Sequence, residues 1–85
     1  MNTDNYIRES NNFGANLKFL RNRRGLTLSA LSKELMIPRG TLCYYECGYC
    51  TPSSEREKEI ATYYGLKSAD DLFMNPSDFT KKYGV

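Results

Sequence analysis

Residues 26–48 read LTLSALSKELMIPRGTLCYYECG, and this stretch decides the fold. Its second half begins after a proline, a residue suited to the first turn of a helix, and has apolar side chains three positions apart. Only Met36 and Ile37 separate the two halves. Two helices joined so tightly must cross steeply, and the stretch therefore predicts a helix-turn-helix. Its first half gathers three leucines on one helical face: Leu28, Leu31 and Leu35.

A first helix is predicted before this unit. Asn11 or Asn12 can cap its start, and the helix is expected to run to about Arg24. Gly25 would then supply the left-handed residue that ends it. Three apolar residues at helical spacing form its expected buried face: Phe13, Leu17 and Leu20.

The second and third helices belong to the quoted stretch. Thr27 is expected to cap the second, which should end near Leu35. The third is expected from about Arg39 to Cys47, stopping at Gly48. Leu42 and Tyr45 would form its buried side.

Two further helices are predicted after the unit. Ser54 and Glu57 have the spacing of a capping box for a fourth helix that ends at Gly65. Ser68 is expected to cap a short fifth helix that continues to Phe73. The fourth helix should bury three residues: Ile60, Ala61 and Tyr64.

The domain organisation follows from these elements and from the length of 85 residues, which suits one small domain. We expect an all-α, compact five-helix bundle that contains the helix-turn-helix. Residues 11–74 would form this domain, residues 1–10 a flexible N-terminal arm, and residues 75–85 a C-terminal tail.

Composition narrows the classes of function. The net charge is only +2, but residues 1–24 hold five Lys or Arg against two Asp or Glu. The chain has no histidine and no glycine-rich phosphate loop, so we expect neither an enzyme nor a bound cofactor. It also has no apolar stretch of membrane-spanning length and no secretory leader, which predicts a cytoplasmic protein that does not enter a membrane.

Three cysteines, Cys43, Cys47 and Cys50, form a C-x3-C-x2-C pattern. A structural zinc site needs four ligands, and no histidine can supply the missing one. We therefore expect reduced thiols and no metal, with a redox or metal sensor as the alternative.

The order and spacing of motif residues over positions 13–73 resemble the Cro/repressor-type, or Xre, helix-turn-helix family, whose fold is lambda-repressor-like. This resemblance implies a sequence-specific DNA-binding transcriptional regulator with double-stranded DNA as its partner. The residues that carry it are Arg21, Gly25-Leu26-Thr27, Leu31, Leu35, Ile37, Thr41-Leu42, Glu46, Gly48, Pro52, Ile60-Ala61, Gly65-Leu66 and Asp71-Leu72-Phe73.

The resemblance also implies which residues read bases. Exposed positions in the first turns of the third helix would face base edges: Arg39, Gly40, Cys43 and Tyr44. Thr41 would lie near the DNA backbone. Arg39 has the best chemistry, because a guanidinium can bind guanine O6 and N7 together.

Phosphate contacts are expected around this helix. The start of the second helix, at Thr27, Leu28 and Ser29, presents amides at the positive end of a helix dipole. Leu28 stands where the family commonly has a polar amide, and Ser29 is the expected substitute. Tyr49, in the loop after the third helix, would reach the DNA backbone.

Two further features follow from the resemblance. Arg21 and Glu46 occupy positions that pair in the family, which implies a structural ion pair. Met36 stands at a turn position where the family usually has glycine, so a left-handed conformation there would cost about 1 kcal/mol.

Two-fold symmetry is expected for a DNA-binding regulator, with two recognition helices about 34 Å apart on a pseudo-palindromic site. Aromatic and apolar residues near the C-terminus would form the homodimer interface: Leu72, Phe73, Phe79 and Tyr83. An alternative function is a protein-interaction module, such as an antitoxin or accessory regulator, that uses the tyrosine-rich face from Tyr44 to Tyr49.

Overall fold

The computed structural model describes residues 3–84 of the chain, with the side chains of residues 10–84. Over this range every regular element is helical, which confirms the predicted all-α, five-helix bundle. The elements are α1 (Thr3–Arg23), α2 (Leu28–Leu35), α3 (Arg39–Glu46), α4 (Ser54–Tyr64), the 3-10 helix η1 (Ala69–Phe73) and α5 (Pro76–Tyr83).

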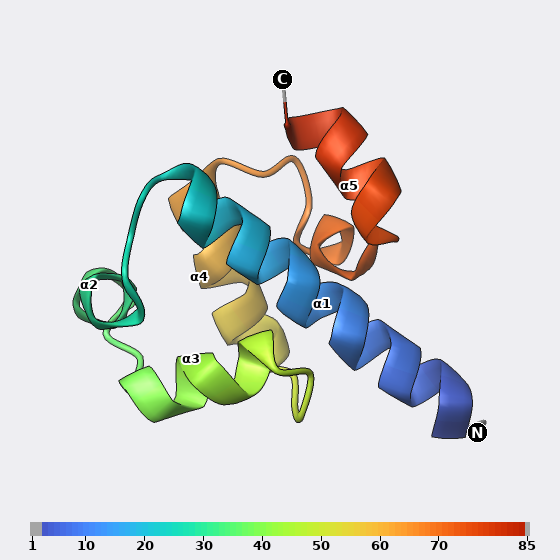
Figure 1. The fold of residues 1–85 in the computed structure, drawn as a ribbon, viewed down its shortest axis with the longest axis horizontal. Coiled ribbons are helices and arrows are strands. Elements are labelled where there is room, and N and C mark those ends of the chain that lie inside the picture. Colours follow the sequence, from blue (N-terminus) through green and yellow to red (C-terminus); the bar gives the residue numbers. More distant parts are fainter. Residues whose placement is uncertain (1–2, 85) are drawn as a thin grey trace.

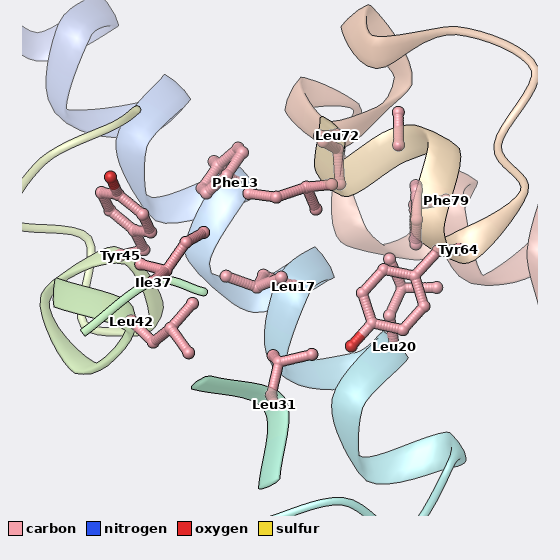
Figure 2. Packing of buried hydrophobic residues seen from close by; sticks show 12 residues of the cluster. Phe13, Leu17, Leu20, Leu31, Ile37, Leu42, Tyr45, Tyr64, Leu72 and Phe79 are labelled. Carbon is pink, nitrogen blue, oxygen red and sulfur yellow. The ribbon is translucent and has the colours of Figure 1, made fainter. Parts of the chain in front are cut away.

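The long helix α1 runs through the middle of the molecule, with α3 and α5 on opposite sides of it (Figure 1). Its apolar side chains lie at the centre of the core, between those of α2 and α3 and those of α4, η1 and α5 (Figure 2). Every side chain predicted to be buried on α1, α3 and α4 is buried. The core residues are Phe13, Leu17, Leu20, Leu31, Ile37, Leu42, Tyr45, Ile60, Ala61, Tyr64, Leu72 and Phe79.

The expected N-terminal arm and its asparagine cap are wrong over the described residues. Helix α1 already begins at Thr3, and Asn12 lies inside it, where its amide donates to the Phe73 carbonyl at 3.3 Å. Asn16, one turn further, is 1% exposed and donates to the carbonyls of Leu72 and Met74 at 2.9 and 2.8 Å. These amides therefore satisfy carbonyls at the C-terminal end of η1. Residues 1 and 2 of the predicted arm lie outside the described residues.

Helix α1 has 21 residues, the greatest length among the described helices. None of the helices between residues 3 and 84 is both long and apolar enough to cross a membrane.

The expected C-terminal tail is also wrong, because residues 76–83 form α5 and belong to the domain. Phe79 of this helix is fully buried and meets Phe19 of α1 edge to face, with ring centroids 6.2 Å apart. The Tyr83 hydroxyl donates to the Asp71 carboxylate, and Lys82 lies 2.9 Å from the same carboxylate oxygen. Burial of one aromatic ring and this polar cluster together hold α5 in place.

Helix ends follow the predicted glycines more closely than the predicted caps. Gly25 and Gly65 adopt the left-handed conformation that ends α1 and α4, as predicted. The N-cap of α4 is Ser53, which accepts from the Arg56 amide, so the capping box expected at Ser54 is wrong by one residue. Ser68 caps a 3-10 helix in place of the short α-helix that was expected.

Backbone contact between α1 and α3 depends on a glycine. A Cβ atom at Gly14 would lie 2.5 Å from the backbone oxygen of Tyr45 and 2.7 Å from that of Glu46. Real Cβ atoms do not approach backbone oxygens this closely. Gly14 therefore lets α3 lie directly against α1.

The turn between α2 and α3 is held by a single serine. The Ser32 backbone oxygen accepts from the Ile37 amide at 3.2 Å, and the Ser32 hydroxyl donates to the Ile37 oxygen at 2.5 Å. Met36 has φ 56° and ψ 40°, the left-handed conformation expected at this position. Its side chain is 88% exposed, so packing contributes little there.

We predict that Gly14→Ala destabilises the protein by about 1–3 kcal/mol, because the added methyl group must push α1 and α3 apart. Gly40→Ala is the matched control, since nothing lies within 4 Å of its Cβ position. Alanine is the better helix former, so this control should gain roughly 0.5 kcal/mol. Urea unfolding of both variants measures the two effects, and equal effects of the same sign would contradict the close contact.

We predict that Met36→Gly stabilises the protein by about 1 kcal/mol, because glycine adopts the left-handed conformation without the Cβ clash. Met36→Ala keeps a Cβ atom and should change the free energy of unfolding by less than about 0.5 kcal/mol. The same urea titration compares the variants. A glycine variant no more stable than the alanine variant would refute strain at this turn.

Candidate nucleic-acid interface

Helix α3 presents one side to the core and the other to solvent. Leu42 is fully buried and Tyr45 is 4% exposed. Thr41 is half-buried, at the border between the buried side and the surface. The remaining side is open. It includes the four residues that were expected to face base edges: Arg39, Gly40, Cys43 and Tyr44.

Arg39 stands at the first residue of α3, where a cation opposes the positive end of the helix dipole. Its side chain is exposed, and none of the described carboxylates forms an ion pair with it. Arg39 and Glu46 are the charged residues within the helix. Because Glu46 is paired elsewhere, the open side of α3 carries a free cation and no free carboxylate.

The three residues predicted to contact phosphate at the start of α2 differ in their surroundings. Thr27 is exposed and its hydroxyl oxygen accepts from the Ala30 amide at 3.0 Å, so it caps the helix as predicted. Ser29 is exposed as well. Leu28 is half-buried and packs against the core, so its side chain serves the fold and only its backbone amide is available for a phosphate.

Two tyrosines form an exposed pair at the other end of α3. Tyr44 is 57% exposed and Tyr49 is 74% exposed, and their rings meet edge to face with centroids 5.9 Å apart. The Tyr49 amide donates to the Tyr44 carbonyl at 3.0 Å, and Gly48 between them has φ +80°. This turn places Tyr49, a loop residue, beside the open side of α3.

The cysteines separate into a pair and a single residue. Cys43 and Cys47 are exposed and one helical turn apart, whereas Cys50 is half-buried against the core. Partial desolvation and the neighbouring Cys43 thiol raise the pKa of Cys47. Among the described side chains, no group of three or more His, Cys, Asp or Glu is placed to hold a metal ion.

The ion pair implied by the resemblance is present. The Arg21 Nε and Nη2 atoms donate to the two carboxylate oxygens of Glu46 at 2.7 and 3.0 Å, and Nη1 donates to the Leu26 carbonyl at 2.8 Å. Both side chains are largely buried, 13% and 7% exposed. Hydrogen bonding to Glu46 raises the pKa of Arg21 above its already high ordinary value. The pair fixes the end of α3 against α1.

Two of the four residues expected to form a dimer interface are wrong for that role, because they are buried in the core. Leu72 and Phe79 are fully buried in the core of one chain, and Phe73 and Tyr83 are half-buried against it. Phe73 packs on Phe13, and Tyr83 on Phe79. Phe73, Phe79 and Tyr83 thus stabilise the attachment of η1 and α5. The two fully buried residues, Leu72 and Phe79, cannot contact a second chain.

A separate groove of about 550 Å³ lies between α2 and α4. Leu35 and Tyr63 contribute apolar surface, and carboxylates surround it. None of the residues predicted to bind DNA lines this groove. Its lining consists of Glu34, Leu35, Glu55, Lys58, Glu59, Thr62 and Tyr63.

Two residues next to the interface were missed as site residues. Cys47 extends the open side of α3 by one turn beyond Cys43. Lys18 of α1 is exposed and close enough to Cys47 to favour its thiolate form. Lys18 follows Gly14 by four residues, so it lies on the α3 side of α1. Gly14, a glycine inside the apolar pattern of α1, was the available signal for the close contact between α1 and α3.

We predict that Glu46→Ala destabilises the protein by about 3 kcal/mol, because it leaves the Arg21 guanidinium buried without its carboxylate. Glu59→Ala is the matched control, since this carboxylate is exposed on α4 and should change stability by less than about 0.5 kcal/mol. Thermal and urea unfolding measure both variants. An unchanged melting temperature for Glu46→Ala would show that the pair does not hold α3.

A scan against protein-family models and searches of curated proteins and of solved structures found no match to this chain. Membership of the Xre family stays a prediction drawn from the motif residues.

Proposed function

We propose that this protein is a sequence-specific DNA-binding transcriptional regulator that inserts α3 into the major groove. The observation that carries the proposal is the open side of α3, which bears Arg39 and no free carboxylate. Three residues join this helix to α2. Such a side can approach a polyanion, and the α2–α3 pair has the lengths and the short connection of a helix-turn-helix.

The size of α3 suits this role. Eight residues form a helix about 12 Å long, and the major groove is about 12 Å wide and 8.5 Å deep. Arg39 would bind a guanine through O6 and N7. Gly40 adds no side chain, so the helix backbone can approach the bases closely. Tyr44 would donate to a phosphate or lie against a thymine methyl group.

Phosphate contacts would hold this orientation. The start of α2 offers backbone amides at Leu28 and Ser29 together with the Ser29 hydroxyl, at the positive end of the helix dipole. Tyr49 and Lys18, both near the C-terminal end of α3, would reach the DNA backbone. Contacts of this kind position the protein, whereas the base contacts specify the sequence.

A homodimer remains part of the proposal, because two half-sites one helical turn apart would compensate for the single cation on each α3. Leu72 and Phe79 are fully buried and are not available for it. This function fits the cytoplasmic location that the sequence predicts.

We predict that selection from random duplexes enriches a motif whose binding weakens steeply as salt rises, because Lys and Arg contacts release counterions. Arg39→Ala should relax the preference at one base pair by about 1–3 kcal/mol. Lys58→Ala, which removes a cation from the α2–α4 groove, is the matched control and should leave the motif unchanged. Absence of an enriched motif, or equal effects of the two substitutions, would contradict readout by α3.

The exposed pair of Tyr44 and Tyr49 favours a second candidate function, a protein-interaction module such as an antitoxin or accessory regulator. Aromatic residues are enriched in interfaces, and this surface has few cations. Binding through such a surface would persist at high salt and would be lost in Tyr49→Ala. Salt dependence therefore separates the two functions.

A further inference from the structure

The open side of α3 carries two thiols in a defined arrangement. Cys43 and Cys47 are both exposed, and the Cys47 amide donates to the Cys43 carbonyl at 2.9 Å. Cys47 has φ −80° and ψ −9°, so the helical path continues through it although it is the C-cap. Residues four apart on a helix have Cβ atoms about 5–6 Å apart. The two sulfur atoms therefore project from the same strip of surface within reach of one ion.

We propose that Cys43 and Cys47 form a two-thiolate binding site for a soft cation of low coordination number, of the Cu(I) class. Thiolates select soft ions, and Cu(I) is stable with two sulfur ligands. Zinc would need four ligands, and the described residues gather no group of three candidate ligands. Cys50 is excluded from the pair, because it lies in the following loop and packs against the core.

Binding changes the charge of this surface without electron transfer. Each thiol releases one proton to solvent, two sulfur–copper bonds form, and the copper stays Cu(I). The site then changes from neutral to a net charge of −1. This charge would stand on the side of α3 that faces phosphates, so copper loading should weaken DNA binding. That consequence rests on the proposed function, whereas the metal site itself does not.

The metal site is tested without DNA. The reduced, full-length protein is titrated anaerobically with Cu(I) in competition with a chromogenic Cu(I) chelator. We expect one ion per chain, with affinity at least 100-fold lower in Cys43→Ser and in Cys47→Ser. Cys50→Ser is the matched control and should stay within threefold of the parent protein. Circular dichroism establishes that each variant is folded.

Several results would overturn the site. These are a loss of affinity in Cys50→Ser equal to that in the other variants, an unchanged affinity in either of them, or a copper ion shared between two chains in native mass spectrometry. A second measurement uses the unsubstituted protein. Copper loading should slow iodoacetamide alkylation of Cys43 and Cys47 at least tenfold, and unchanged alkylation rates would refute the proposal.

The regulatory consequence is tested on the selected duplex. One equivalent of Cu(I) should reduce the affinity of the parent protein at least tenfold, while the ratio of loaded to unloaded affinity in the Cys43→Ser, Cys47→Ser double variant should stay near one. Copper binding without any effect on DNA affinity would overturn the regulatory role alone. Failure of the copper-free protein to bind any duplex would instead contradict the proposed function and leave the metal site standing.

Discussion

The bidentate ion pair between Arg21 and Glu46 fixes α3, and the arrangement of the helix-turn-helix depends on it. Arg21 also donates to the Leu26 carbonyl, so one guanidinium joins α1, the segment before α2 and the end of α3. Gly14 lies seven residues before Arg21, on the same face of α1, and lets the backbone of α3 approach closely. An ion pair and a close backbone contact thus hold α3 from one side and leave its other side open.

This way of attaching α3 has an electrostatic consequence. The Glu46 carboxylate is paired with Arg21 inside the protein, so α3 has no free carboxylate on its outward side. Arg39 is exposed on that side. The acidic side chains Glu34, Glu55 and Glu59 gather instead around the groove between α2 and α4. The outward side of α3 is therefore suited to meet a phosphate backbone, and the groove is not. Thiols and tyrosines supply the rest of the open side, so the proposed DNA binding would depend on a few specific contacts with little general attraction.

Local patterns predicted the helices and their buried faces well. Apolar spacing in α1 to α4 identified the core, because a helix repeats every 3.6 residues and needs no knowledge of its partners. Gly25 and Gly65 marked helix ends for an equally local reason, the left-handed backbone. The ion pair and the exposure of Arg39 and Tyr44 came from the family resemblance and agree with the structure. DNA contacts themselves stay a prediction.

Some errors are local, because the cap of α4 lies at Ser53 and the segment after Ser68 forms a 3-10 helix. The others concern tertiary contacts that no local pattern reveals. Asn16, for which the apolar spacing predicted no role, has a buried amide that donates to two carbonyls more than fifty residues away. Phe79 and Tyr83 were expected at an interface, but Phe79 is fully buried against Phe19 of the distant helix α1, and Tyr83 is half-buried against Phe79. Gly14 interrupts the helical pattern of α1, but the spacing of residues could not show why, because its role depends on how closely the backbone of α3 approaches.

The most direct test of readout by α3 is a titration of the isotopically labelled protein with duplex DNA at low salt, followed by amide chemical shifts. We predict that the shifts of residues 27–29 and 39–49 move, together with Lys18, while those of the α2–α4 groove and of α5 stay. Movement centred on the groove or on α5, or no movement at any residue, would contradict binding of DNA through the open side of α3.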